Sequence, residues 1–187
     1  MDAFSYLSVL LSIIVGLGMA QVLTAMGRLI RTSDRVIWYW PPLVWSGALL
    51  VIYVQVWWSM FGLQSYVNWT FGAFLVVLLQ NVALYMMAAV ILPEAADDHA
   101  FDLRFHYERQ CGWFFGFFAA ALIISVVKEL IVAGRLPLPA NLAFHGIFLL
   151  MCVSALVIRT PRYHQLVAFA GVGAIFSYIL LLFWKLG

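Results

Sequence analysis

Long apolar stretches alternate with short polar segments along the chain, and the apolar stretches determine the expected fold. An α-helix needs about 20 apolar residues to cross the hydrocarbon core of a bilayer. The strands of a membrane barrel would instead alternate apolar and polar residues, and these stretches are continuously apolar. Six stretches meet the requirement for a helix: 5–27, 41–61, 70–92, 111–132, 139–158 and 163–184. The pattern predicts an all-α polytopic integral membrane protein with six transmembrane helices in a single transmembrane domain.

Composition agrees with this prediction and excludes most soluble classes of protein. Of the 187 residues, 66% are hydrophobic and only 10% are charged, and the mean hydropathy is +1.02. Soluble domains have about 45–50% apolar and about 25% charged residues. We therefore expect the lipid bilayer to be the main partner of the chain. The net charge of +2 is too small to indicate a nucleic-acid partner.

The basic residues are unevenly divided between the two sets of loops and so predict an orientation. Loops 28–40, 93–110 and 159–162 hold seven arginines: Arg28, Arg31, Arg35, Arg104, Arg109, Arg159 and Arg162. The loops on the other side hold only Arg135 and Lys185. Because basic residues favour the cytosolic side, we expect these three loops in the cytosol and both termini outside, in a plasma or inner membrane. Residues 97–110 are expected to form a cytosolic amphipathic connector.

Small residues recur at every fourth position in two of the predicted spans. They are Ser8, Ser12, Gly16, Ala20 and Thr24 in the first span, and Gly112, Gly116 and Ala120 in the fourth. Such ridges let helix backbones approach closely in lipid. We expect spans one, four and six to form the packed centre, and span two to face lipid. The same chemistry serves oligomerisation, so a homo-oligomer or a partner membrane subunit is also expected.

A short repeated motif makes an internal repeat a hypothesis. Gly27-Arg28-Leu29 follows the first span, and Gly134-Arg135-Leu136 follows the fourth. Six spans divide into two halves of opposite orientation, as in many transporters. The motif therefore suggests a 3+3 inverted repeat.

Polar side chains within the spans are the candidate functional residues, because they are costly in lipid and tend to face protein or water. They are Gln21, Gln55, Gln80, Asn81, Lys128, Glu129, Asn141 and His145. Folding spans four and five into a hairpin brings His145 within about one turn of Lys128 and Glu129. We expect an outer cluster there, a middle step at Gln80 and Asn81, and an inner step at Gln21. Such a series would make a polar path or a ligand site, with His145 as its protonatable group.

A structural interpretation of the same residues stays open. Span four would then end near Val127, and Lys128 would extend to the interface. The amide side chains would act as contacts between helices.

No motif indicates a metal, a cofactor or a reaction. His99, Asp102 and His106 share a helical face and are the candidates for a metal site, but their spacing matches no known site. The chain has no phosphate-binding glycine loop, no zinc-protease motif and no nucleophile elbow. A haem would want two axial histidines at matching depth, and only His145 was expected inside a span. We therefore predict no catalytic residue and no cofactor, and an enzyme is the less favoured class.

Three functions remain open from the sequence. The leading prediction is a small channel or transporter that moves an ion, a proton or a small solute through the polar path. The first alternative is a non-catalytic membrane subunit or sensor that acts through a partner protein. An intramembrane enzyme or redox subunit is the second alternative, with the least support.

Overall fold

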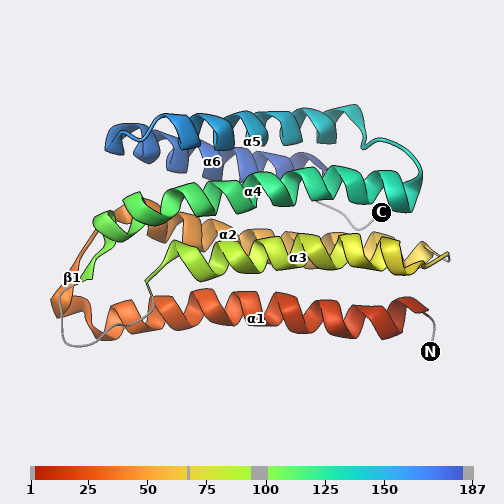
Figure 1. Ribbon diagram of the computed structural model, residues 1–187, viewed down its shortest axis with the longest axis horizontal. Coiled ribbons are helices and arrows are strands. Elements are labelled where there is room, and N and C mark those ends of the chain that lie inside the picture. Colours follow the sequence, from red (N-terminus) through yellow and green to blue (C-terminus); the bar gives the residue numbers. More distant parts are fainter. Residues whose placement is uncertain (1–2, 67, 94–100, 183–187) are drawn as a thin grey trace.

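Six long α-helices run antiparallel to one another and make up nearly all of the fold (Figure 1). The computed structural model describes residues 3–66, 68–93 and 101–182. Within them the helices are α1 (Ala3–Arg31), α2 (Trp40–Met60), α3 (Phe71–Ile91), α4 (Leu103–Ala133), α5 (Pro139–Val157) and α6 (Pro161–Leu182). Each is long and apolar enough to cross a membrane. The chain is therefore an all-α polytopic membrane protein, as the apolar pattern predicts.

The bundle has two distinct ends. At one end lie the start of α1, the short helix η2 (Phe61–Ser65) and the turn from α4 to α5, and we call it the N-terminal end. At the other lie η1 (Ser33–Arg35) and the two-residue strands β1 (Val36–Ile37) and β2 (Phe101–Asp102), which pair in parallel. All seven arginines of the predicted cytosolic loops are at this second end, which we call the arginine end. Its placement in the cytosol stays a prediction.

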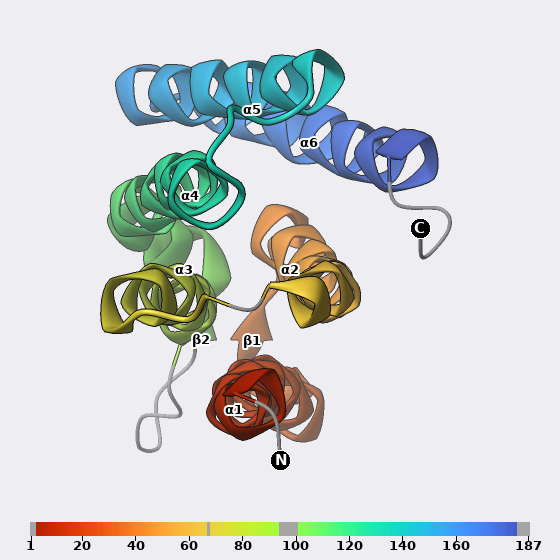
Figure 2. The same ribbon diagram turned by 90° about the vertical axis from the view of Figure 1, so that its right-hand side faces the viewer.

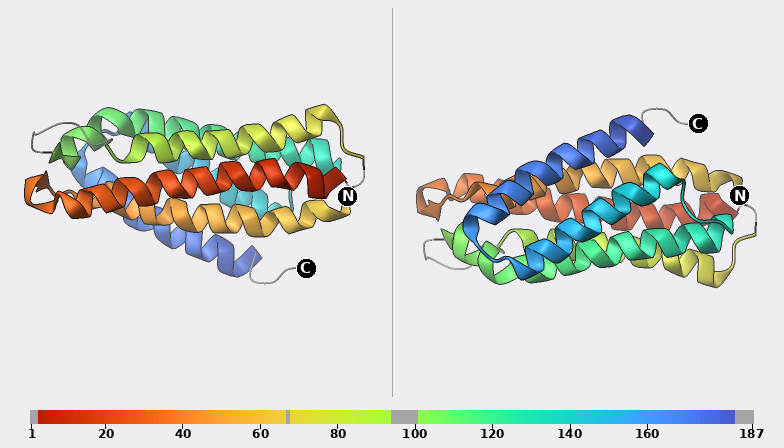
Figure 3. Two further views of the ribbon diagram at one scale, coloured as in Figure 1. Left: turned by 90° about the horizontal axis from the view of Figure 1, so that it is seen from below. Right: turned by 90° about the horizontal axis from the view of Figure 1, so that it is seen from above.

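Five of the six helices form a ring. Around the ring α2 contacts α3, α3 contacts α4, α4 contacts α5, α5 contacts α6, and α6 contacts α2. Figure 2 shows this arrangement in a view along the bundle, with α1 outside the ring against α2 and α3. Helices α5 and α6 run obliquely across the other four (Figure 3). The ring surrounds the space in which the candidate site lies.

The packing differs from the prediction that α2 faces lipid. Trp45, Leu49 and Tyr53 of α2 are fully buried, so this helix belongs to the centre of the bundle. Tryptophan is often found at the interface, but Trp45 instead fills the space between α2 and α4 and contacts Phe114. The prediction that spans one, four and six form the centre is wrong for α1, which lies outside the ring.

The small-residue ridges also lie elsewhere than expected. Helix α1 buries a different stripe, at positions 11, 15, 18, 22, 25 and 29, whose spacing alternates between four and three residues. On the ridge, Gly16, Ala20 and Thr24 are exposed, and Ser8 and Ser12 are half-buried. Gly112, Gly116 and Ala120 of α4 are half-buried, while their neighbours Phe114, Phe115 and Phe118 are buried. Within this chain, the residues of the two ridges are therefore less buried than their neighbours on the same helices.

Helix α4 begins about two turns earlier than predicted. Residues 97–100 of the expected connector lie outside the described residues, and residues 103–110 are the first turns of α4 itself. Asp102 ends the preceding strand and caps the helix, because its Oδ1 accepts hydrogen bonds from the backbone N–H groups of Arg104 (2.8 Å) and Phe105 (3.1 Å). Arg104 and Glu108 form an ion pair one turn apart, at 2.8 Å.

Replacing Asp102 with alanine is expected to lower the free energy of unfolding by about 1 kcal/mol, because two N–H groups of the first turn lose their acceptor. Thermal unfolding in detergent measures the loss, and faster hydrogen exchange at the Arg104 and Phe105 amides locates it. Asp102→Asn keeps an acceptor and is expected to retain most of the stability. Asp34→Ala, at an exposed carboxylate that caps no long helix, is the control. Equal stability of Asp102→Ala and the parent would contradict the role of this cap.

The two Gly-Arg-Leu segments differ in conformation. Gly134 ends α4 in the left-handed region with φ 65°, whereas Gly27 lies inside α1. The motif therefore gives no support to a 3+3 inverted repeat, which stays a hypothesis.

Candidate functional site

A cavity lies inside the helix ring toward the N-terminal end, and we call it the polar cavity. Its outer part, the mouth, has a volume of about 440 Å³ and includes residues of η2 and of the turn between α4 and α5. Its inner part, the chamber, has about 80 Å³ and is lined by all five ring helices. The two parts share Gln55, Val56, Gln80, Ser125 and Tyr178, so they adjoin each other. Together they extend from the N-terminal end of the bundle into its interior.

The chamber is built around a histidine on α5. His145 is 8% exposed, and its Nδ1 lies 2.9 Å from the backbone oxygen of Asn141, one turn earlier. Because a carbonyl only accepts hydrogen bonds, Nδ1 carries a proton. In the neutral ring Nε2 then holds a lone pair and acts as an acceptor. The helix geometry therefore selects one tautomer of His145.

A second hydrogen bond connects α5 to α6 beside this histidine. The Tyr178 hydroxyl donates to Oδ1 of Asn141 at 3.1 Å. The rings of Tyr178 and His145 meet nearly edge to face, with centroids 6.3 Å apart. Asn141 therefore holds both groups, through its backbone and its side chain.

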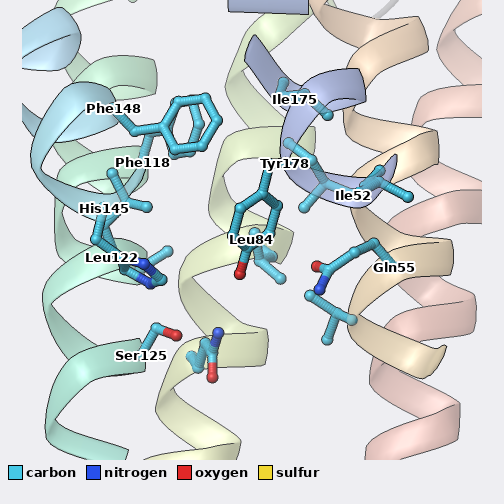
Figure 4. A pocket seen from close by; sticks show the side chains of 14 residues that line it. Ile52, Gln55, Leu84, Phe118, Leu122, Ser125, His145, Phe148, Ile175 and Tyr178 are labelled. Carbon is cyan, nitrogen blue, oxygen red and sulfur yellow. The ribbon is translucent and has the colours of Figure 1, made fainter. Parts of the chain in front are cut away.

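Two glutamines face the cavity from the opposite side of the ring. Gln55 comes from α2 and Gln80 from α3, and both line the mouth and the chamber. Figure 4 shows Gln55, Ser125, His145 and Tyr178 directed toward one space. Neither glutamine amide forms a hydrogen bond with another described residue. Polar groups that only contact helices would be satisfied by the protein, so these amides are available to water or a solute.

The mouth carries three charged residues at the end of α4. Lys128 and Glu129 are half-buried and line the mouth, and Arg135 lines its edge. Lys128 and Glu129 interact electrostatically, but none of the three forms an ion pair with another residue in the described part of the chain. Helix α4 continues through Ala133, so the alternative in which it ends near Val127 is wrong. Both charges belong to the helix wall of the cavity.

Six of the eight predicted polar residues line this one cavity: Gln55, Gln80, Lys128, Glu129, Asn141 and His145. Asn81 is buried on α3, where its Nδ2 donates to the Val77 carbonyl at 2.8 Å, and it lines neither part. Gln21 lies on α1, outside the ring. The inner step expected at Gln21 is therefore not part of the cavity, and the chamber ends instead against Phe118, Phe148 and Ile175.

Sequence reasoning missed two members of the cavity and one buried histidine. Ser125 and Tyr178 line both parts of the cavity, but serine and tyrosine are common in packed helices and give no signal of their own. His164 is buried within α6, so His145 is not the one histidine inside a helix. His164 falls within the predicted sixth span, 163–184, but it was not counted among the polar residues of the spans.

The candidates for a metal site do not form one in the described residues. His99 lies outside them. Asp102 caps α4, and His106 Nε2 donates to the Val90 carbonyl at 3.1 Å, at the end of α3. No group of three metal-binding side chains occurs among the residues that the structure describes. Asp102 and His106 instead form hydrogen bonds with backbone groups at the ends of α4 and α3.

The fold and the cavity together define the class of the protein. It is a polytopic membrane protein in which five helices enclose a polar cavity and a sixth lies outside. The chain has no significant match to a protein-family model, to a curated protein or to a solved structure.

Proposed function

We propose that the protein is a small channel or transporter that moves an ion, a proton or a small solute through the polar cavity. The observation that carries the proposal is the convergence of polar side chains from α2, α3, α4 and α5 on one space inside the ring. Polar and ionisable groups inside a membrane are costly, and they typically mark a path or a binding site.

The lack of protein partners for these groups supports a role in binding a solute rather than a role in helix packing. The amides of Gln55 and Gln80 lack a partner among the described residues, and Lys128 and Glu129 form no ion pair there. Groups that served only to join helices would bond to each other across the ring. The cavity instead offers donors, acceptors and both signs of charge to whatever enters it.

Ion flux into proteoliposomes tests the proposal. Purified protein is reconstituted in vesicles, and the fluxes of protons, sodium and chloride are followed under an imposed gradient. Gln80→Leu is expected to lower the flux of the permeant ion about tenfold, which corresponds to about 1.4 kcal/mol on the barrier. The reason is that leucine removes an amide that faces the cavity.

Gln21→Leu is the matched control, because it makes the same substitution on α1, outside the ring. It is expected to leave flux unchanged. Equal loss in both variants would show a general effect on folding. Flux of all three ions no greater than in protein-free vesicles would overturn the proposal for these ions.

A second function, a membrane subunit that acts through a partner, is favoured by one observation. On the ridge of α1, Gly16, Ala20 and Thr24 are exposed, and no atom lies within 4 Å of a Cβ placed at Gly16. Small exposed residues permit close approach of another helix in lipid. Purification in mild detergent distinguishes the two functions: a fixed partner that is lost in Gly16→Leu, together with absence of flux, would favour the subunit.

A further inference from the structure

A second cavity lies at the arginine end and is not part of the site above. Its volume is about 220 Å³, and it is lined by Tyr39, Tyr107, Glu108, Cys111, Arg159, Pro161 and His164. None of these residues lines the polar cavity. We call it the arginine-end cavity.

The arginine-end cavity is built around a buried histidine and tyrosine. His164 is 3% exposed and Tyr107 is 2% exposed, and the Tyr107 hydroxyl lies 3.0 Å from Nδ1 of His164. Their rings meet edge to face with centroids 5.4 Å apart. Arg159 forms no ion pair within the described residues, and the nearby Glu108 is paired with Arg104. A cationic group thus remains open to a solute.

The two cavities present the same chemical groups. In the polar cavity these are the His145 imidazole, the Tyr178 phenol, the Glu129 carboxylate and the Lys128 ammonium group. In the arginine-end cavity they are the His164 imidazole, the Tyr107 phenol, the Glu108 carboxylate and the Arg159 guanidinium group. Matching donors, acceptors and charges suit the same small ion or hydrogen-bonding solute at both places.

The cavities are stacked along shared helices. On α4, Cys111 lines the arginine-end cavity and Phe118 ends the chamber, about 10 Å further along the helix axis. On α6, His164 lines the arginine-end cavity and Ile175 lines the chamber. Only the residues between these positions separate the two spaces.

An aromatic cluster fills that separation. Trp45 is fully buried, and its ring centroid lies 5.5 Å from that of Phe114, 5.6 Å from Phe115 and 6.1 Å from Phe118. On its other side the indole packs against the backbone of α6. A Cβ at Gly171 would lie 2.5 Å from Cη2 of Trp45, so only glycine permits this contact. We call these four aromatic residues the barrier.

We propose that the arginine-end cavity is a second site for the transported ion or solute, separated from the polar cavity by the barrier around Trp45. This inference rests on the proposed function. In such a path the ion or solute passes from one cavity to the other only when the barrier opens. The Tyr107–His164 pair then receives the solute at the arginine end.

The two native cysteines provide the test. Cys111 lines the arginine-end cavity, whereas Cys152 is fully buried on α5 and lines neither cavity. A small, charged, membrane-impermeant methanethiosulfonate is applied to each side of vesicles that contain Cys152→Ala protein. Labelling of Cys111 is expected from the arginine end and absent from the N-terminal end. Cysteines placed at exposed Ser33 and Leu136, in a background without native cysteines, report which side is which.

Variants of the barrier extend the test. Trp45→Ala is expected to let the reagent reach Cys111 from the N-terminal end as well, because it removes the central ring. Phe118→Ala, at the edge of the barrier, gives the same test if the first variant does not fold. Cys111→Ala protein, which retains Cys152, is the control and is expected to stay unlabelled.

The outcomes separate this inference from the proposed function. Labelling of Cys111 is expected to abolish flux, because the charged thioalkyl group that the reagent attaches through a disulfide occupies the cavity. Unchanged flux after complete labelling would overturn the second site and leave the proposed function intact. Cys111 that is labelled from neither side, or equally from both sides in the parent, would also overturn it. Absence of flux in unlabelled protein would overturn the proposed function itself.

Discussion

Replacing Gly18 with alanine is expected to lower the free energy of unfolding by about 1–3 kcal/mol, the usual cost of extra volume in a packed core. Gly18 lies on the buried stripe of α1, and the ring of Tyr53 on α2 packs directly on its backbone. A Cβ there would overlap the Tyr53 hydroxyl and lie 2.8 Å from Cε1 of the same ring. Tyr53 is fully buried, so its ring can yield to the new methyl group only if the packing around it changes. Thermal unfolding in detergent measures the change.

The matched control is Gly16→Ala on the same helix. No atom lies within 4 Å of a Cβ at Gly16, so this variant is expected to be as stable as the parent or slightly more stable, since alanine favours a helix by about 1 kcal/mol. Equal destabilisation by both variants would show that α1 does not pack through Gly18.

A second variant identifies the clashing atom. The Tyr53 hydroxyl is buried without a hydrogen-bond partner among the described residues, so Tyr53→Phe is expected to be neutral or stabilising. It also removes an atom that overlaps the new methyl group. Gly18→Ala is therefore expected to cost less in the Tyr53→Phe background, and a double-mutant cycle measures the difference. An unchanged cost would place the strain elsewhere.

Removing either charge of the mouth is expected to lower the flux of ions of the opposite charge about tenfold or more. Glu129→Gln is expected to lower cation flux, and Lys128→Met is expected to lower anion flux. Both side chains line the mouth without an ion pair in the described chain. A unit charge roughly 8 Å from an ion contributes about 2 kcal/mol at an effective dielectric constant of about 20. Flux in proteoliposomes, measured with sodium and with chloride, checks the expectation.

Arg109→Gln serves as the control for these charge changes. It removes a charge on the same helix at an exposed position that lines neither cavity. Flux in this variant is expected to equal that of the parent. If Glu129→Gln and Lys128→Met both leave cation and anion flux unchanged, the mouth is not on the path.

The membrane fold was predictable from sequence because it follows from one physical requirement. A helix in lipid must present about 20 apolar residues, and six segments of that length stand out from their flanking arginines and prolines. The start of α4 was not predictable in this way. Residues 103–110 are mostly polar, yet the Asp102 cap starts the helix there, and hydropathy carries no information on capping.

The faces of the helices were harder to predict than the helices themselves. In lipid an apolar residue is as stable on the surface of the bundle as in its interior. Two stripes of α1 could therefore equally form its packed face. The small residues of the ridge and the larger residues around Gly18 both have helical spacing, and the structure buries the second. Trp45 illustrates the same difficulty, because tryptophan suits both an interface and a core.

Part of the candidate site was predictable because polar residues in a span are few. Gln55, Gln80, Glu129 and His145 stood out from their apolar neighbours, and the hairpin of α4 and α5 placed two of them together. Their meeting with α2 and α3 depends on the closure of the ring, which no local pattern encodes. The prediction that Gln21 lines the path was wrong for the same reason, since its helix lies outside the ring.

The contact between α2 and α6 closes the ring, and it joins helices that are far apart in the order of synthesis. Until α6 is inserted, Trp45 lacks the surface of Gly171, and Gln55 and Gln80 face an incomplete wall. In a chain without α6, Gln55 of α2 and Gln80 of α3 would therefore line an open groove rather than an enclosed cavity. The last helix along the chain therefore completes the enclosure of the cavity, so the first five helices alone cannot form it.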